Sequence, residues 1–560
     1  MTALSYVSGS SDEPLLGMTI GQALERAAAT WPDRPALISP SHGVAWTWVQ
    51  LRERARNLAA GFCALGLERG ERIGCWSLNR PEWTLTQFAA AEAGLVFVTI
   101  NPAYRLHELE YALTKVGCAA LVTATQFKTS DFIGMINKLA PELARGRPGA
   151  LNCARLPDLR MVIQIGETAP GALAFEEVAK GEGGDLAALD ALGPELQFDD
   201  PANIQFTSGT TGSPKGVTLS HHNILNNGYF TGRAMRLKPD DRICIPVPLY
   251  HCFGMVMGNL AAVTLGSAMV YPGEGFDPLA TLKTIASERC TALYGVPTMF
   301  IAELEHPEFE RFDLSSLRTG IMAGAPCPIA VMRKVVERMH MRDVTIAYGM
   351  TETSPVSFQS STDDSMERRV TTIGRVHPHV EVKIVDQEGR IVERGERGEL
   401  CTRGYSVMSG YWGEPEKTRE AKDGANWMHT GDLAVIDEEG YGNIVGRIKD
   451  MVIRGGENLY PREIEEFLFR HPKVQEAQVF GVADDRYGEE LCAWIRVRGG
   501  ETLTAEEVRA FCDGQIAHNK IPRYVEFVTE FPMTVTGKAQ KFLMRAAVEE
   551  RLGLKKALTA

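Results

Sequence analysis

The sequence predicts an α/β protein with a large N-terminal domain of mainly parallel sheets, a small β unit, and a smaller α+β domain at the C-terminus. Two observations along the 560 residues predict this fold class. Short apolar runs rich in β-branched and aromatic residues alternate with stretches of helical length, as in parallel sheets covered on both faces. From about Ile373 this alternation gives way to runs punctuated by glycine, which are typical of antiparallel strands.

The first part of the chain predicts the parallel sheets. Amphipathic stretches at 47–66 and 277–289 have the length and spacing of helices that connect such strands. The strands expected here are 72–78, 95–100, 119–124, 161–166, 242–247, 268–273, 292–296, 319–324 and 344–349.

The later part predicts the β unit and the second domain. Residues 381–404 alternate and turn at glycines, which indicates a small antiparallel unit. Beyond Asp450, one expected helix has Pro461 in its first turn, and another opens with Thr504 and Glu507 at the spacing of a capping box. Strands and helices mix throughout this stretch, so we expect a separate small domain.

Composition limits the class of protein. The chain is 44% hydrophobic and 23% charged, as in ordinary globular proteins, and its net charge of −12 argues against a nucleic-acid surface. Its 11 cysteines form no C-x-x-C pair and leave an odd one over, which indicates a reducing compartment. The first residues lack the basic and apolar regions of a secretory signal. We therefore expect a cytoplasmic protein.

One segment is long and apolar enough to suggest a membrane span. Residues 243–273 contain no Asp, Glu, Lys or Arg. However, Pro246, Pro248, Asn259 and several glycines divide the segment into short pieces. The sequence therefore predicts a buried strand, turn, helix and strand, and no transmembrane segment.

The stretch "TSGTTGSPKG", residues 207–216, combines glycines, hydroxyl side chains and Lys215. Such a loop is either a plain turn or a phosphate cradle, in which backbone N–H groups, hydroxyls and a cation surround an anion. A P-loop is excluded, because its lysine follows glycine and precedes Ser or Thr, whereas Lys215 lies between Pro214 and Gly216.

Four further short stretches indicate a function only when they are taken together. "YGMTETSP" follows an expected strand and offers a ring, a hydroxyl and a carboxylate, the last a ligand that Mg²⁺ prefers. "HTGDLA" and "GRIKD" offer an Asp and an Arg for a ribose, and "PMTVTGKAQK" carries a lysine near the C-terminus. Each alone is more typical of a turn or a solvated surface.

Read in order over 22–551, these stretches resemble the adenylate-forming superfamily of acyl-CoA synthetases, acyl-adenylating enzymes and luciferases. "PLYHCFG", "LYGVPTMF", "RGYSVMSGYWGEPEKT" and "KDMVIRGGENLYPREIE" look most like the medium-chain acyl-CoA synthetases of the family member 2 branch. The resemblance implies an N-terminal AMP-binding and acyl-binding domain over 1–447, a hinge at 448–450 and a mobile C-terminal domain over 451–560.

By this resemblance the chain binds ATP with Mg²⁺, and Glu352 is the metal ligand. Lys538 supports adenylation, and together with Thr351, Glu352 and His251 it forms the catalytic set. The ATP-binding residues implied are Thr207, Ser208, Gly209, Thr210, Thr211, Gly212, Lys215, Gly324, Ala325, Pro326, Tyr348, Gly349, Thr351, Asp432, Arg447 and Lys538.

The resemblance also implies where the acid and coenzyme A bind. His251, Phe253, Val296 and Gly324 line the acyl pocket, and Gly455, Gly456 and Glu457 line the tunnel for the CoA arm. In the family the C-terminal domain swings about the hinge, here Lys449, so that the adenylation lysine is withdrawn before CoA attacks.

The implied activity is that of an AMP-forming acid–thiol ligase of lipid metabolism. It converts a carboxylic acid to acyl-AMP with release of pyrophosphate and then transfers the acyl group to CoA. The favoured substrate is a medium-chain fatty acid. Long-chain acids, short branched or sulfur-containing acids and aryl acids are alternative substrates. An amino-acid-activating domain fits less well, because Gly254 follows Phe253 where those domains typically carry an aspartate. A catalytically silent nucleotide-binding regulator and a homo-oligomer also stay open.

Overall fold

The computed structural model describes residues 3–127, 129–207, 214–325, 327–455, 457–534 and 539–554. The chain divides into two compact units. Unit 1 comprises Met1–Val7, Val382–Cys401 and His429–Ala560, and unit 2 comprises Ser8–Glu381 and Thr402–Met428. The division predicted from the sequence, with a hinge at 448–450 between 1–447 and 451–560, describes which parts of the chain move relative to each other. It stays a prediction.

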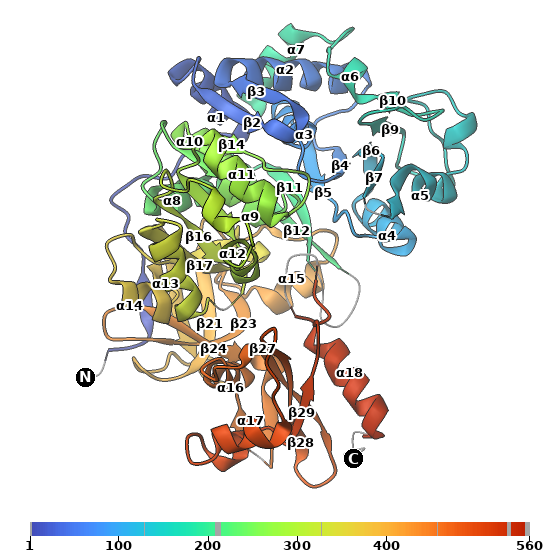
Figure 1. Cartoon of the computed structure of the whole chain (residues 1–560). Helices are drawn as coiled ribbons and strands as arrows, with labels where there is room; N and C mark the ends of the chain where they lie inside the picture. Colours follow the sequence, from blue (N-terminus) through green and yellow to red (C-terminus); the bar gives the residue numbers. More distant parts are fainter. Residues whose placement is uncertain are drawn as a thin grey trace. The chain divides into compact units, whose positions relative to one another are not determined.

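Unit 2 is built on two large sheets with parallel strands at their centres (Figure 1). The nine-stranded sheet has the order β19-β18-β17-β16-β15-β13-β14-β2-β3, and the strands from β17 to β2 run parallel. Its strands are β2 (Pro35–Ser39), β3 (Val44–Thr47), β13 (Arg242–Cys244), β14 (Ala268–Val270), β15 (Ala292–Gly295), β16 (Thr319–Ala323), β17 (Asp343–Gly349), β18 (Val356–Gln359) and β19 (Arg375–Val376).

The eight-stranded sheet has the order β10-β9-β6-β4-β5-β11-β12-β22, parallel from β10 to β11. Its strands are β4 (Arg72–Trp76), β5 (Val96–Thr99), β6 (Cys118–Thr123), β9 (Met161–Gln164), β10 (Leu173–Ala174), β11 (Pro201–Thr207), β12 (Lys215–Ser220) and β22 (Gly410–Tyr411). All nine strands predicted from the apolar runs are present. Their residues are buried on both faces, which explains why the runs are continuously apolar.

Side-chain caps fix where the predicted connecting helices begin. Helix α2 (Trp48–Ala64) is preceded by a capping box: Thr47 Oγ1 accepts from the Gln50 N–H, and Gln50 Oε1 accepts from the Thr47 N–H. Helix α11 (Pro278–Glu288) begins after Asp277, whose carboxylate accepts from the Ala280 N–H at 2.7 Å.

The charge-free segment folds into short buried pieces, as predicted. After β13 come helix α9 (Cys252–Gly254), a π-helical turn η4 (Met255–Leu260) and helix α10 (Ala261–Leu265), followed by β14. Among the described residues, no helix is both long and apolar enough to cross a membrane.

Unit 1 contains most of a five-stranded sheet and, beyond it, the mixed sheet of the C-terminal region. The first has the order β1-β20-β21-β23-β24, and the second the order β26-β25-β28-β27 with β29 beside β28. The strands are β1 (Tyr6–Ser8), β20 (Val380–Val385), β21 (Gly398–Gly404), β23 (Met428–Ile436), β24 (Gly442–Arg447), β25 (Val452–Arg454), β26 (Glu457–Leu459), β27 (Val474–Asp484), β28 (Gly488–Val497) and β29 (Tyr524–Phe527).

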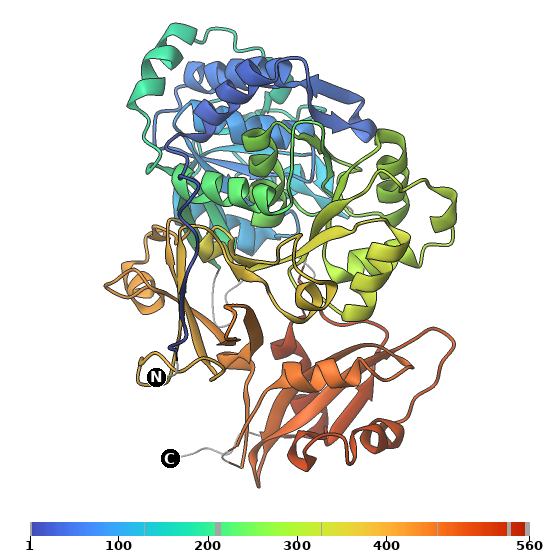
Figure 2. The same ribbon diagram turned by 90° about the vertical axis from the view of Figure 1, so that its left-hand side faces the viewer.

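The helices of the C-terminal region also match the prediction. Helix α16 (Pro461–Leu468) begins with Pro461 and lies against β27, as the orange helix across this sheet shows in Figure 2. Helix α17 (Ala505–Cys512) has the predicted capping box of Thr504 and Glu507. Helix α18 (Lys541–Leu552) contacts β27 as well.

A buried histidine couples the stability of unit 2 to pH. His221, the first residue of helix α8 (His221–Ala234), accepts through Nδ1 from the N–H of Ile20, the first residue of helix α1 (Ile20–Thr30), at 3.2 Å. Burial lowers the pKa of His221 from 6.5 to about 4. The imidazole therefore stays neutral in the fold.

We expect acid to destabilise the protein through this residue. Between pH 6.5 and about 4 the unfolded chain binds a proton at His221 and the folded chain does not, so stability is lost as the pH falls through this window, by about 3 kcal/mol. The variant His221→Asn keeps an acceptor but does not titrate. Urea unfolding at pH 7 and pH 4.5 should show a smaller loss for the variant than for the wild type; equal losses would contradict this role.

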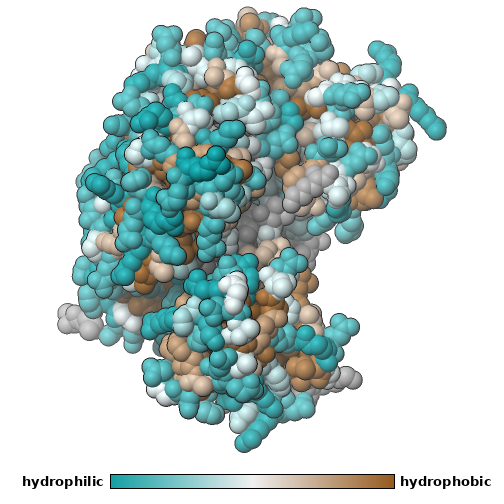
Figure 3. All heavy atoms as spheres, in the orientation of Figure 1, coloured by the Kyte–Doolittle hydropathy of each residue, from teal (hydrophilic) through white to brown (hydrophobic). Residues whose placement is uncertain are grey.

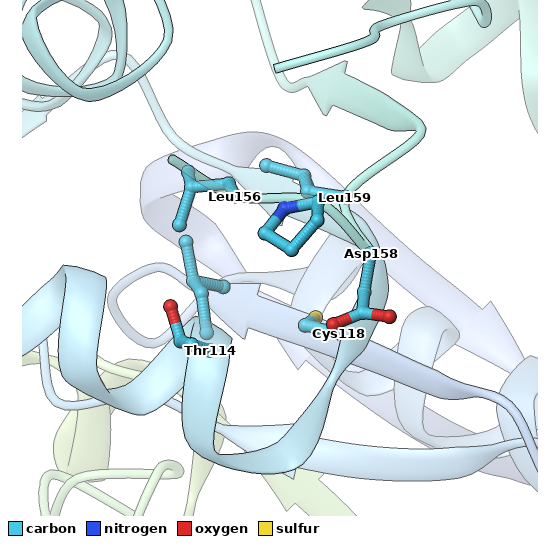
Figure 4. Close-up of a pocket in the computed structure, with 7 residues that line it drawn as sticks. Thr114, Cys118, Leu156, Asp158 and Leu159 are labelled. Atoms are coloured by element: carbon cyan, nitrogen blue, oxygen red, sulfur yellow. The ribbon is translucent and has the colours of Figure 1, made fainter. Parts of the chain in front are cut away.

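The surface and the thiols add two observations. On the face drawn in Figure 3, hydrophilic side chains predominate and hydrophobic ones occur in small groups. All 11 cysteines are unpaired, in agreement with the absence of a disulfide framework in the sequence. A shallow surface hollow near Thr114 and Cys118 (Figure 4) contains none of the predicted site residues.

Candidate active site

The predicted adenine and acyl residues gather at one edge of the nine-stranded sheet. Val296 follows β15, Gly324 and Ala325 follow β16, and Tyr348 and Gly349 end β17. These three strands are parallel neighbours, so their carboxyl ends lie along the same edge. Ligands of open α/β sheets bind at such an edge, where loops leave the strands.

The predicted phosphate loop joins two paired strands. Thr207, the last residue of β11, lies opposite Lys215, the first residue of β12. The ammonium group of Lys215 lies 4.5 Å from the centre of the Tyr411 ring, a cation–π contact. Tyr411 comes from β22, which pairs with β12. The register of three strands therefore positions the lysine.

Glu352 is the buried carboxylate beside this lysine–ring pair. It lies in a 3-10 turn, Thr351–Thr353, and is only 7% exposed. Its Oε1 accepts from the Tyr411 hydroxyl at 2.9 Å, and its carbonyl accepts from the Met408 N–H at 2.9 Å. Burial and the charge of Glu352 raise the pKa of Tyr411 far above its usual value, so the phenol stays protonated and donates.

Sequence reasoning missed Tyr411 as a site residue. It lies within "RGYSVMSGYWGEPEKT", a stretch that indicated the family but carried no predicted role. Only the pairing of β22 with β12, far away in the sequence, brings its ring to Lys215 and its hydroxyl to Glu352. We add Tyr411 to the site as a positioning residue.

Two of the predicted acyl pocket residues, Phe253 and Val296, belong with Cys252 and Tyr294 to one buried apolar cluster, here called the apolar wall. His251 caps helix α9, and its Nδ1 accepts from the Phe253 N–H at 3.2 Å. The Phe253 ring stacks on Tyr294, with ring centres 5.8 Å apart. Gly324 has φ +86°, and a Cβ placed there would lie 3.2 Å from Val296, so these two residues face each other closely.

Cys252 belongs to the apolar wall and also lies near Glu352. The Cys252 thiol donates to Gln205 Oε1 at 3.2 Å, and burial, with a smaller contribution from Glu352, raises its pKa to about 12. Gln205 Nε2 donates to Met255 Sδ, and the Tyr294 hydroxyl donates to the carbonyl of Met257, both in the π-helical turn. The predicted catalytic residues Thr351 and Glu352 are therefore neighbours of the apolar wall.

The predicted ribose residues pair with each other in unit 1. Asp432 and Arg447 are direct partners in the β23–β24 ladder, and Arg447 Nε lies 2.9 Å from Asp432 Oδ1. Asp432 is buried and Arg447 is 49% exposed, so the ion pair lies at the surface with its carboxylate inward. Lys449, the predicted hinge residue, follows in the exposed turn Ile448–Asp450.

Gly455 and Glu457, two of the predicted CoA residues, belong to a hairpin of unit 1. Arg454 pairs with Glu457, which leaves two residues between β25 and β26. Gly455, the first of them, has φ +60°, and a Cβ there would lie 3.2 Å from the Tyr487 ring. Both the backbone and the ring therefore favour glycine at this position.

Several predicted residues lie outside the part of the chain that the structure describes, and their roles stay predictions. They are Ser208, Gly209, Thr210, Thr211, Gly212, Pro326, Gly456 and Lys538.

The site fits a hard divalent cation at Glu352. In the described part of the chain, no lysine or arginine forms an ion pair with this buried carboxylate. A buried carboxylate ordinarily needs a cationic partner. Carboxylate oxygens are the ligands that Mg²⁺ prefers, so Glu352 can hold the ion.

Comparison with known proteins identifies the class. Residues 24–412 match the AMP-binding enzyme family, and residues 463–538 match the C-terminal domain of AMP-binding enzymes. The mitochondrial medium-chain acyl-CoA ligase ACSF2 of Danio rerio is 48% identical over 98% of this chain and 91% of its own. The protein YngI of Bacillus subtilis (strain 168) is 48% identical over 96% of this chain and 99% of its own.

A solved structure agrees with these relatives. The anthranilate CoA ligase AuaEII, in complex with anthranoyl-AMP, has a TM-score of 0.84 and 27% identity over 97% of this chain and 99% of its own. Fold and site therefore define an enzyme that activates a carboxylic acid with ATP. The chain belongs to the AMP-binding enzyme family, and it is an AMP-forming acyl-CoA ligase that uses ATP and CoA.

The predicted cytoplasmic location is wrong. The Danio rerio relative and its bovine and human counterparts are all named as mitochondrial proteins. The prediction rested on the number and spacing of the 11 cysteines, which indicate a reducing compartment but not which one, and on first residues without a secretory signal, which do not bear on other compartments.

Proposed function

We propose that this ligase activates a medium-chain fatty acid, and that the residues assembled above perform the activation. One observation carries the proposal: Lys215, Tyr411 and Glu352 lie together, and Cys252, a member of the apolar wall, lies near Glu352. Such a site can bind the triphosphate of ATP next to the uncharged acyl chain of the acid.

In the first step the acid's carboxylate attacks the α-phosphorus of ATP, and pyrophosphate leaves. Negative charge builds on the phosphate oxygens, so fixed donors and cations lower the barrier. Lys215 and the hydroxyl of Thr351 supply such groups in unit 2, and Lys538 supplies a further cation. A carboxylate is already ionised at neutral pH, so no general base is needed.

Bound at Glu352, Mg²⁺ would neutralise charge on the phosphates. Tyr411 keeps the Glu352 carboxylate in place by donating to Oε1. Met408 fixes the backbone of the same residue. The orientation of the carboxylate is thus set before any substrate arrives.

In the second step the CoA thiol attacks the acyl carbon, the C–S bond forms and AMP leaves. Asp432 and Arg447 hold the ribose of the nucleotide. Gly455 allows the CoA arm to pass close to the backbone, because a side chain there would meet the Tyr487 ring. The role of Lys449 as hinge follows from the family resemblance.

The apolar wall accounts for the choice of acid. His251, Phe253 and Val296 present little charge, and most residues of the segment from β13 to β14 are buried. Each methylene that enters such a pocket contributes about 0.8 kcal/mol, or about fourfold in affinity. The relatives named medium-chain acyl-CoA ligases support an intermediate length.

A panel of acids tests this proposal. Formation of acyl-CoA should be measured with straight-chain acids from acetate to stearate, with short branched acids and with benzoate. We expect kcat/KM to rise about fourfold per methylene, peak at medium length and then fall. A peak at the longest acid, or a preference for benzoate, would assign another substrate class. A regulator without catalysis would give no signal with any acid.

A further inference from the structure

Three side chains of kinds that can bind a metal ion lie together on the sheet of unit 1. Glu399 and Cys401 are two residues apart in β21, so they point to the same face. His429 comes from β23, the next strand in the sheet. Each offers one ligand atom, and the three atoms lie within 4.8 Å of one another.

The distances within this cluster are close to those of a zinc coordination shell. His429 Nδ1 lies 3.5 Å from Cys401 Sγ and 2.9 Å from Glu399 Oε2. At usual zinc bond lengths, tetrahedral geometry separates nitrogen from sulfur by about 3.5 Å and nitrogen from oxygen by about 3.4 Å. An ion therefore needs only a small movement of Glu399.

The kind of ligand selects the kind of ion. A thiolate and an imidazole favour zinc and similar soft cations over Mg²⁺ or Ca²⁺. Nδ1 of His429 carries at most one proton and can donate well to only one of its two neighbours, whereas a cation can bind all three. Glu399 and His429 are 22% and 34% exposed and Cys401 is buried behind them, so an ion can arrive from solvent.

We propose that Glu399, Cys401 and His429 form an inhibitory site for a thiophilic divalent cation of the zinc class. Glu399 Oε1 also accepts from the Gly431 N–H at 3.1 Å, and Thr430 Oγ1 accepts from the Asp432 N–H at 3.1 Å and donates to the Leu400 carbonyl at 2.8 Å. The turn that carries Asp432 is thus attached to β21. An ion that draws Glu399 toward itself disturbs this turn and weakens ATP binding, an effect that rests on the proposed role of Asp432.

Cobalt titration of the full chain tests the site without relying on catalysis. Bound Co²⁺ should give a thiolate-to-metal charge-transfer band and the visible bands of tetrahedral coordination, and added Zn²⁺ should remove both. The variants Cys401→Ser and His429→Asn should lose the band and bind Zn²⁺ at least about 100-fold more weakly. Cys63→Ser, at a partly exposed thiol of α2, is the matched control and should keep it.

Thermal unfolding without metal checks that the variants fold. His429→Asn changes a partly exposed residue and keeps the experiment decisive if Cys401→Ser is unstable. No charge-transfer band in the wild type, or a band that survives in both variants, would overturn the site. ATP binding should weaken with Zn²⁺ in the wild type and not in the variants. If the metal binds but ATP affinity does not change, the inhibitory coupling is wrong and the ligase assignment is unaffected.

Discussion

Changing Glu352 to Gln is expected to reduce acid-dependent exchange of pyrophosphate into ATP by about 100- to 1000-fold. The replacement has the same shape. In the wild type the Tyr411 hydroxyl donates to Glu352 Oε1 at 2.9 Å, and the amide oxygen of the variant can still accept this bond. The backbone bond from Met408 also persists. What is lost is the negative charge, and with it the proposed ligand for Mg²⁺.

Tyr411→Phe is the matched control for this prediction. It removes the hydrogen bond to Glu352 but keeps the ring beneath Lys215. We expect a loss of about tenfold in exchange, the size of one hydrogen bond to a charged group. Thermal unfolding should show both variants folded. If Glu352→Gln lost no more exchange than Tyr411→Phe, the metal-ligand role would be wrong.

Lys538→Ala is expected to separate the two half-reactions. A cation beside the departing pyrophosphate stabilises the transition state of adenylation, so its removal should slow acyl-AMP formation by about 100-fold or more. The transfer of acyl from supplied acyl-AMP to CoA forms no such charge and should proceed near the rate of the wild type. Single-turnover assays of each step, with the same acid, measure the ratio.

A neighbouring lysine provides the control for Lys538. Lys541 Nζ lies 2.6 Å from Glu465 Oε1, and both side chains are largely buried. Lys541→Ala should therefore lower the stability of unit 1 and leave the ratio of the two half-reactions unchanged. Equal slowing of both steps in Lys538→Ala would contradict a role confined to adenylation.

Strands and caps were predictable because their signals are local. Continuous apolar runs identified the parallel strands, and Thr504 with Glu507 identified the start of α17. The same holds for the charge-free segment, where prolines and glycines predicted short buried pieces in spite of its hydrophobicity. In each case the deciding residues are within a few positions of the element they define.

Candidate site residues could be named from the sequence only where a motif is continuous. Asp432 and Arg447 were both assigned to the ribose from separate motifs, and the register of β23 and β24 makes them direct partners. Tyr411 has no local signal, because its role depends on the pairing of β22 with β12. The cluster of Cys401 and His429 also has no local signal, because two neighbouring strands bring these residues together.

The π-helical turn Met255–Leu260 allows the apolar wall to change shape through a single deletion. Such turns arise when a helix accommodates one extra residue. Removing a residue here returns the turn to ordinary α-helical winding without breaking the chain on either side. The side chains before it would then rotate relative to those after it, and Met257 would leave the hydroxyl of Tyr294. A single deletion is therefore a short path by which relatives of this enzyme can acquire a differently shaped apolar wall.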